Sequence, residues 1–146
     1  MRFSIPGEPY GKGRPRVVNV GNRTMAFTPH KTVSYENLVK MEYQAQSEGK
    51  TFTDKQVRMN IRAYYGLPKS DSRSKRTAKL AGIIRPTKKP DIDNVYKIIA
   101  DALNGIAYND DSQIVSASVE KLYSETPRVD VTIEEVQHET LLNCQS

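Results

Sequence analysis

The sequence predicts an α+β fold, a small single domain in which a mixed β-sheet packs with helices. The chain has 146 residues, which is enough for one hydrophobic core. Segments in which apolar and polar residues alternate lie near both ends of the chain, and segments with helical spacing lie between them. We therefore expect one domain over residues 1–136, followed by a flexible tail over residues 137–146.

The first third of the chain is predicted to form a strand, a hairpin and a helix. Phe3 and Ile5 alternate with polar residues, which indicates a strand, and a Gly- and Pro-rich stretch follows it. Two short apolar runs, Val17–Val20 and Met25–Thr28, flank a Gly-Asn pair and predict a short hairpin. Apolar spacing then predicts a helix over Val33–Ser47. The helix face that we expect to be buried consists of Tyr35, Leu38, Met41 and Ala45.

The remainder of the chain adds strands around further helices. Regular alternation over Lys55–Tyr65 predicts a half-buried strand. A short basic helix is expected within Lys69–Gly82, and a basic loop over Arg85–Pro90. Two more alternating segments, Ile114–Leu122 and Arg128–Val136, predict two final strands.

The clearest helix prediction covers Asp91–Asn104. Pro90 disfavours helix before this segment, Asp91 can cap it by accepting a backbone N–H, and Gly105 ends it. One side of the helix should pack into the core, because its apolar residues form a continuous arc. These residues are Ile92, Val95, Ile98, Ile99, Ala102 and Leu103.

The opposite side of this helix is charged. Asp93, Lys97 and Asp101 are spaced by four residues, so each lies about 40° around the helix from the next. A short loop then brings Asp110 and Asp111 in front of a strand. Taken singly, these residues have ordinary structural explanations: acids favour helix N-termini, Asp and Lys pair at this spacing, and aspartates are common in turns.

Composition excludes several classes of protein. No run of about 18 apolar residues occurs, so we expect no membrane span and no membrane partner. The single cysteine, Cys144, excludes an internal disulfide, and with only His30 and His138 besides it argues against a structural zinc site. The first residues lack the apolar core of a signal peptide, so we expect a cytoplasmic protein.

Charge is divided unevenly along the chain. Residues 1–90 carry 19 Lys and Arg against 6 Asp and Glu, whereas residues 91–146 carry 3 against 11. This division predicts a basic surface for a polyanion beside an acidic site. Contacts to a DNA backbone are expected from Lys12, Arg14 and Arg16 in the Gly/Pro-rich loop and from Arg73, Lys75, Arg76 and Lys79 in the basic helix.

Several carboxylates within a basic chain indicate a metal-dependent nuclease. Hard cations such as Mg²⁺ take oxygen ligands, usually one or two carboxylates together with water and phosphate. At a phosphodiester such an ion activates water and stabilises the leaving oxygen, while a nearby lysine neutralises developing charge. In this interpretation the acids hold the ion and the cations bind the nucleic-acid backbone. No organic cofactor is expected.

Two sets of motifs resemble a known family. The first consists of Asp91-Ile92-Asp93-Asn94, Lys97, Asp101-Ala102-Leu103 and Asp110-Asp111 with Gln113-Ile114. The second consists of Ile5-Pro6-Gly7, Gly13-Arg14-Pro15-Arg16, Thr28-Pro29 and Tyr35-Glu36. Together they resemble the RusA family of Holliday junction resolvases, which are common in bacteria and prophages, over roughly residues 3–135.

The resemblance implies a small mixed α/β fold, homodimers, and four-way junction DNA as the substrate in recombination and repair. Asp91, Asp93 and Asp111 match the metal-binding carboxylates of the family, and Lys97 matches its catalytic lysine. The implied metal is Mg²⁺, for which Mn²⁺ can substitute. Asp110 matches a second acid of the motif, and we favour Asp111 over it as the ligand. The implied activity is that of a crossover junction endodeoxyribonuclease.

Two other functions stay open at this point. One is a non-catalytic DNA-binding or architectural protein, in which the acids only cap helices and solubilise the chain. The other is a metal-dependent nuclease for other branched DNA or for RNA. Cleavage with and without Mg²⁺ separates the first from a junction resolvase, and a comparison of substrates separates the second.

Overall fold

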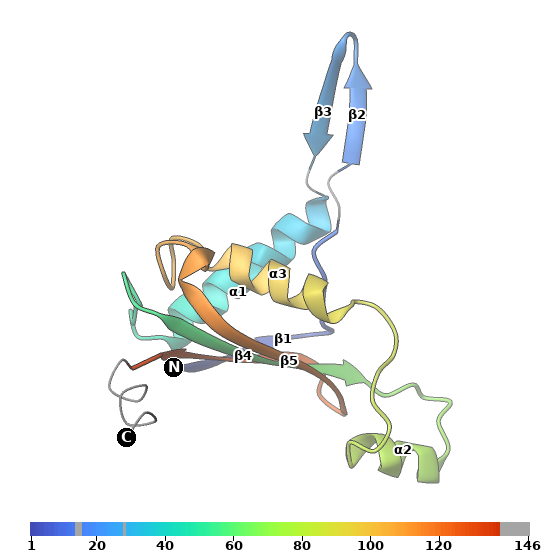
Figure 1. Ribbon diagram of the computed structural model, residues 1–146. Coiled ribbons are helices and arrows are strands. Elements are labelled where there is room, and N and C mark those ends of the chain that lie inside the picture. The colour runs from blue at the N-terminus through green and yellow to red at the C-terminus, as the bar shows by residue number, and fades with distance from the viewer. Residues whose placement is uncertain (14–15, 28, 138–146) are drawn as a thin grey trace.

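The computed structural model of the protein describes residues 1–13, 16–27 and 29–137. Four strands form one sheet, two strands form a separate ribbon, and α1 and α3 cover one face of the sheet (Figure 1). The strands are β1 (Arg2–Pro6), β2 (Arg16–Val20), β3 (Arg23–Phe27), β4 (Val57–Gly66), β5 (Ile114–Ser124) and β6 (Arg128–Glu135). The helices are α1 (His30–Gln46), α2 (Arg73–Leu80) and α3 (Ile92–Ala102), with a 3₁₀ turn, η1 (Asp111–Gln113), before β5.

The sheet is mixed, with the strand order β1-β6-β4-β5. Strand β6 pairs antiparallel with both β1 and β4, whereas β4 and β5 are parallel. The first and last strands of the chain therefore lie side by side. The α+β class and the type of every predicted element are confirmed. The predicted tail falls outside the described residues from 138 onward.

The core lies between the sheet and the two helices that cover it. Strand β4 is central to this core, because every second side chain is buried while Arg58 and Arg62 point to the opposite face and are exposed. Five side chains of β4 lie in the core, and each is at most 1% exposed: Val57, Met59, Ile61, Ala63 and Tyr65. From α3 the core takes Val95, Ile98, Ile99 and Ala102.

Two details of the predicted helix faces are wrong. In α1 the buried side chains are Thr32, Tyr35, Val39 and Tyr43, while Met41 is 63% exposed. The helix is mostly polar, so the apolar spacing on its own did not identify the side that meets the sheet. Ile92, predicted to join the apolar arc of α3, is 48% exposed because it begins the helix.

Lys79 connects α2 both to the loop immediately before it and to strand β5 of the sheet. Lys79 Nζ lies 2.6 Å from the Asp71 carboxylate, and the two side chains are only 7% and 6% exposed. The same ammonium sits 4.7 Å from the centre of the Tyr123 ring, on β5. The prediction that Lys79 contacts DNA is therefore wrong, because its charge is neutralised inside the protein. Arg73 and Lys75 project from the exposed side of this helix.

No helix in the described part of the chain is long and apolar enough to cross a membrane.

Lys79→Ala should loosen α2 selectively. The substitution leaves the Asp71 carboxylate buried without a partner, which costs about 3–5 kcal/mol. We expect the α2 amides to lose protection against hydrogen exchange by a matching amount. Lys75→Ala on the exposed side is the matched control, with an effect below about 0.5 kcal/mol. Equal protection in the two variants would contradict the anchoring role of Lys79.

Candidate metal and nucleic-acid site

The start of α3 is held by a hydrogen bond from the sheet. The Tyr65 hydroxyl on β4 donates to the Pro90 carbonyl at 2.7 Å. Burial raises the pKa of the Tyr65 phenol to about 12, and the nearby charges of Asp91 and Glu8 add to this shift. Tyr65 therefore keeps its proton at neutral pH and remains a donor. This contact fixes the backbone immediately before Asp91.

Asp91 occupies the N-cap position of α3, but its side chain makes no capping hydrogen bond. The predicted acceptance of a backbone N–H by this carboxylate is thus wrong. Asp91 is exposed, and so is Asp93 in the first turn. Two carboxylates separated by one residue are consequently left available at the outer end of the helix.

Lys97 lies one turn beyond Asp93 on the outward side of α3 and is also exposed. Among the described residues, neither Asp93 nor Lys97 takes part in an ion pair within 4.0 Å. The ordinary pairing of these two side chains is therefore absent. The acid and the ammonium are both free to meet a ligand.

Asp101 pairs with Lys12 instead of Lys97, which corrects the partner expected from helical spacing. Lys12 Nζ lies 2.7 Å from the Asp101 carboxylate and 3.4 Å from the Glu36 carboxylate on α1. Burial by itself lowers the pKa of the Lys12 ammonium, but the hydrogen bond and charge of Asp101 and the charge of Glu36 outweigh it. The pKa of Lys12 is therefore raised. Lys12, predicted to meet DNA phosphate from a free loop, is engaged with two acids.

The backbone around Lys12 is also held against α3. The Lys12 N–H donates to the Asn94 carbonyl at 3.1 Å. A Cβ atom at Gly11 would lie 2.6 Å from Cβ of Pro90 and 3.0 Å from Cβ of Asn94, so only glycine fits at this approach. The segment that leads into the β2–β3 ribbon is thus attached along the first turns of the candidate site.

The two neighbouring acids after α3 have different surroundings. The Asp110 carboxylate accepts the Ser112 N–H at 3.1 Å and forms a capping box with Gln113. Hydrogen bonds from Ser112 are the main cause of the lowered pKa of Asp110. Asp111 is half-buried, and its charge helps to raise the pKa of Tyr96 on α3 beyond the effect of burial. Asp110 therefore holds the turn, and the choice of Asp111 as the metal ligand stays a prediction.

The predicted metal ligands do not form a complete cage within one chain. In the described ranges, no three Asp, Glu, His or Cys side chains are close enough together to hold a metal ion. Asp91 lies near Tyr65, whereas Asp111 lies near Tyr96. The three-carboxylate set of Asp91, Asp93 and Asp111 stays a prediction.

The donors at the start of α3 fit an ion of the Mg²⁺ type. Asp91 and Asp93 offer hard oxygen atoms that neither a capping bond nor an ion pair occupies. Mg²⁺ is usually bound by one or two carboxylates, with water and substrate phosphate completing its coordination. This open mode of binding suits an exposed pair of carboxylates better than a closed protein cage.

The predicted DNA-binding residues differ in availability. Arg73 and Lys75 are exposed on α2 and form no ion pair among the described residues. Arg76 lies 3.4 Å from Glu125, and this pair is itself exposed. Arg14 lies outside the described residues, and Arg16 begins β2 with a side chain that is also outside them.

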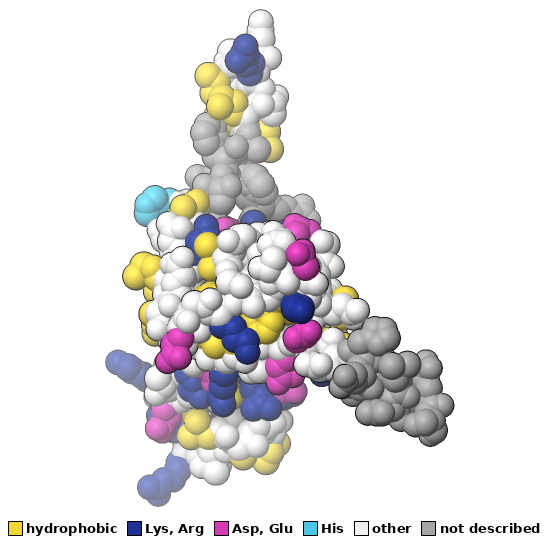
Figure 2. All heavy atoms as spheres, turned by 90° about the vertical axis from the view of Figure 1, so that its left-hand side faces the viewer, with side chains coloured by type: hydrophobic (Ala, Val, Ile, Leu, Met, Phe, Trp, Pro, Cys, Tyr) yellow, Lys and Arg dark blue, Asp and Glu magenta, His cyan; other side chains and the backbone are white. Residues whose placement is uncertain are grey.

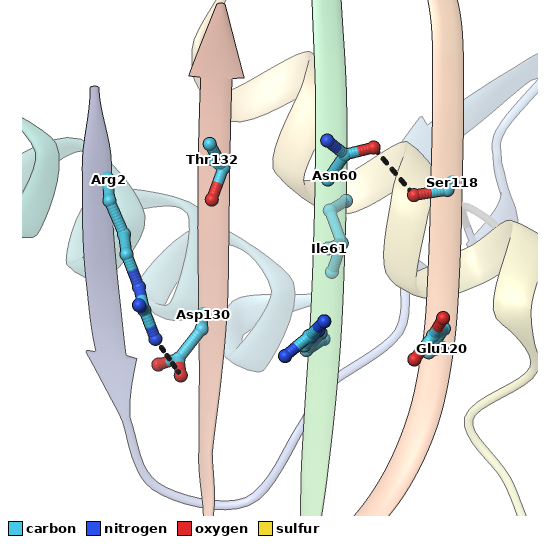
Figure 3. Close-up of a pocket in the computed structure, with 8 residues that line it drawn as sticks. Arg2, Asn60, Ile61, Ser118, Glu120, Asp130 and Thr132 are labelled. Carbon is cyan, nitrogen blue, oxygen red and sulfur yellow. Dashed lines mark hydrogen bonds and ion pairs between the residues drawn. The ribbon is translucent and has the colours of Figure 1, made fainter.

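The helix-free face of the sheet carries a separate polar concavity of about 280 Å³ (Figure 3). Asp130 on β6 is 5% exposed and is held by Arg2 at 3.3 Å and Arg128 at 3.2 Å. Ser118 donates to Asn60 at 2.7 Å across the neighbouring strands. Because its buried carboxylate is already paired with two arginines, this concavity is not a second candidate for a metal site.

Sequence reasoning missed the contacts that organise the site. Lys12 was assigned to DNA, and Tyr65 was read only as a strand residue. A signal was present in the glycines on both sides of Lys12, because glycine often marks a close approach of backbone. Asp71 offered another signal, since it is the only acid between Tyr65 and Pro90 and invites a basic partner.

Comparisons with known proteins identify the family to which this chain belongs. The family model of the endodeoxyribonuclease RusA matches residues 6–134, which include the ribbon, both helices of the core and every motif acid. A protein of Bacillus subtilis (strain 168), described as uncharacterized protein YqaN, is 40% identical over 138 residues. That match covers 93% of this chain and 96% of the relative. Because the family model covers most of its length, this chain belongs to the RusA family of endodeoxyribonucleases.

Proposed function

We propose that the protein is a Mg²⁺-dependent endonuclease that resolves four-way DNA junctions by paired nicks. The observation that carries this proposal is the outward side of α3 in a RusA-family domain, where Asp91, Asp93 and Lys97 are exposed. Within the described residues, no capping bond or ion pair engages these three side chains. Their availability suits a phosphate and a cation that arrive together.

The proposed chemistry divides tasks among these side chains. Asp91, Asp93 and Asp111 would hold the divalent ion, which when bound supplies a more acidic water and stabilises charge at the scissile phosphate. Lys97 holds its positive charge beside the carboxylates and neutralises charge that develops on the phosphate oxygens. Lys12 supports this role indirectly, because it occupies Asp101 and so leaves Lys97 unpaired.

The basic elements support a branched substrate. The β2–β3 ribbon and α2 extend from the body in different directions, with α3 between them (Figure 1). DNA that contacts Arg73 and Lys75 on α2 and the basic segment before the ribbon would pass the outward side of α3. We propose that these contacts bind phosphates and that the acids select where the backbone is cut.

A homodimer completes the proposal. A four-way junction has approximate twofold symmetry, which an isologous dimer matches with two equivalent sites. After the first nick, a second site on the same assembly makes the second cut effectively intramolecular.

Asp93→Asn should lower cleavage of a labelled four-way junction in Mg²⁺ by more than about a hundredfold, the effect of removing one preorganised electrostatic group. Metal-free junction binding should be unchanged or tighter, because a negative charge near phosphate is removed. Asp101→Asn is the matched control and should lose less than about tenfold, because Lys12 keeps Glu36 as a partner. Cleavage by Asp93→Asn at the wild-type rate would refute the catalytic assignment, and no Mg²⁺-dependent nicking by wild type would favour a non-catalytic DNA-binding protein.

Arg73→Ala and Lys75→Ala should each flatten the salt dependence of junction binding. Each lost phosphate contact lowers the magnitude of the slope of log K against log salt by about 0.9 for duplex DNA. Titrations at several salt concentrations without metal measure this slope. An unchanged slope in the double variant would move the DNA away from α2.

Mixed dimers should uncouple the two nicks. Wild type is exchanged with an excess of Asp93→Asn chains and given a junction in a supercoiled plasmid. Because each mixed dimer has one active site, nicked circles should replace linear product. Persistence of linear product together with sedimentation as a monomer would rule out paired cutting by a dimer.

A further inference from the structure

No helix or other strand of the described residues covers the β2–β3 ribbon. It stands away from the body as a two-stranded hairpin, and neither strand packs closely against another helix or strand (Figure 1). Apolar side chains are visible along it in the space-filling view (Figure 2). A two-stranded hairpin is only marginally stable in water on its own. Its apolar side chains are therefore placed for a partner.

The register of the hairpin assigns these side chains to one face. Val18 is opposite Met25, and Val20 is opposite Arg23, so all four side chains project from the same side. Val18, Val20 and Met25 are 43%, 55% and 44% exposed, and we call these three residues the apolar ribbon face. Arg23 places a positive charge at its tip.

The opposite side of the ribbon is different in character. It carries Val17, Asn19 and Thr24, and the Thr24 hydroxyl donates to the Asn19 side chain at 3.2 Å. The two polar side chains near the tip on this side are thus hydrogen-bonded to each other. The apolar ribbon face is the side on which burial would gain most.

Charge identifies the class of partner. No acid occurs between Glu8 and Glu36, while this stretch contains five cations. They are Lys12, Arg14, Arg16, Arg23 and Lys31. A surface that is both apolar and free of negative charge fits a polyanion that also presents apolar faces. Unstacked nucleobases beside their phosphates have this combination.

The attachment of the ribbon relates it to the proposed metal ligands. Gly11 packs on Pro90, and Lys12 is bonded to Asn94 and Asp101 on α3. The first arm of the hairpin therefore leaves the body from the side of the helix that bears Asp91.

We propose that the hairpin inserts its apolar ribbon face between bases at the branch point of the DNA, with Arg23 on an adjacent phosphate. This inference rests on the proposed function. It adds the means by which the protein distinguishes a branch point from a continuous duplex. Wedging apolar side chains into a continuous stack costs a few kcal/mol per step. The cost is smaller at a branch point, where stacking is interrupted, so insertion favours junctions.

The test uses a four-way junction with 2-aminopurine beside the branch point, and a linear duplex of the same sequence, both in EDTA. Wild type should raise the 2-aminopurine fluorescence of the junction by unstacking the base. Val18→Thr/Val20→Thr/Met25→Thr keeps strand propensity while making the face polar. This variant should lose the fluorescence rise and bind the junction about tenfold more weakly, equivalent to about 1.4 kcal/mol. Its duplex binding should stay within about twofold, because the phosphate contacts remain.

Two further variants keep the result specific. Val17→Thr changes the opposite side of the ribbon and should behave as wild type. Val18→Ile/Val20→Ile keeps the face apolar and should retain both the fluorescence rise and the junction preference. A variant in which the hairpin is unfolded would lose both.

Three outcomes would overturn the proposal. One is a threonine variant with an undiminished fluorescence rise, and another is equal weakening for junction and duplex. The third is a shift from dimer to monomer on sedimentation with unchanged fluorescence, which would assign the face to a second copy of the chain. Mg²⁺-dependent junction cleavage by wild type is measured in parallel, so failure of the arm is distinguished from failure of the proposed nuclease function.

Discussion

The burial of one side of α3 against the β-sheet decides which of its side chains are available for chemistry. Val95, Ile98 and Ile99 are essentially inaccessible to solvent, so the helix cannot rotate without exposing them. Asp93 and Lys97 must then face outward. The hydrogen bond from Tyr65 to the residue before Asp91 fixes where the helix begins. The position of the candidate site is thus a consequence of core packing.

Lys12 joins three parts of the molecule at this site. Its ammonium bridges Asp101 on α3 and Glu36 on α1, and its backbone is bonded to α3 next to the close approach of Gly11. Helical spacing places Asp101 within reach of Lys97, but Asp101 pairs with Lys12. Lys97 therefore forms no ion pair within the described residues. The same residue ties the start of the β2–β3 ribbon to the helix.

The uneven distribution of charge along the sequence corresponds to separate basic and acidic regions in the folded protein. Arg73 and Lys75 lie on the exposed side of α2. Lys79, on the same helix, is buried in an ion pair with Asp71. The ribbon carries cations beside apolar side chains, and the acids lie on the outer side of α3. For a member of the RusA family, this arrangement is consistent with the proposed nuclease function, in which α2 and the ribbon bind DNA phosphates and the acids between them direct cleavage. Net charge alone does not show which cations are available to bind DNA, because Lys12 and Lys79 are paired with acids of the same chain.

Local patterns determined much of this protein. Alternation and helical spacing predicted each strand and helix, and the apolar arc predicted that Asp93 and Lys97 face outward, since periodicity depends only on neighbours in sequence. Contacts between distant segments were decided only by the tertiary structure. The pairing of Lys12 with Asp101 and the contact of Lys79 with the Tyr123 ring on β5 depend on how separate elements pack, and no local pattern encodes those distances.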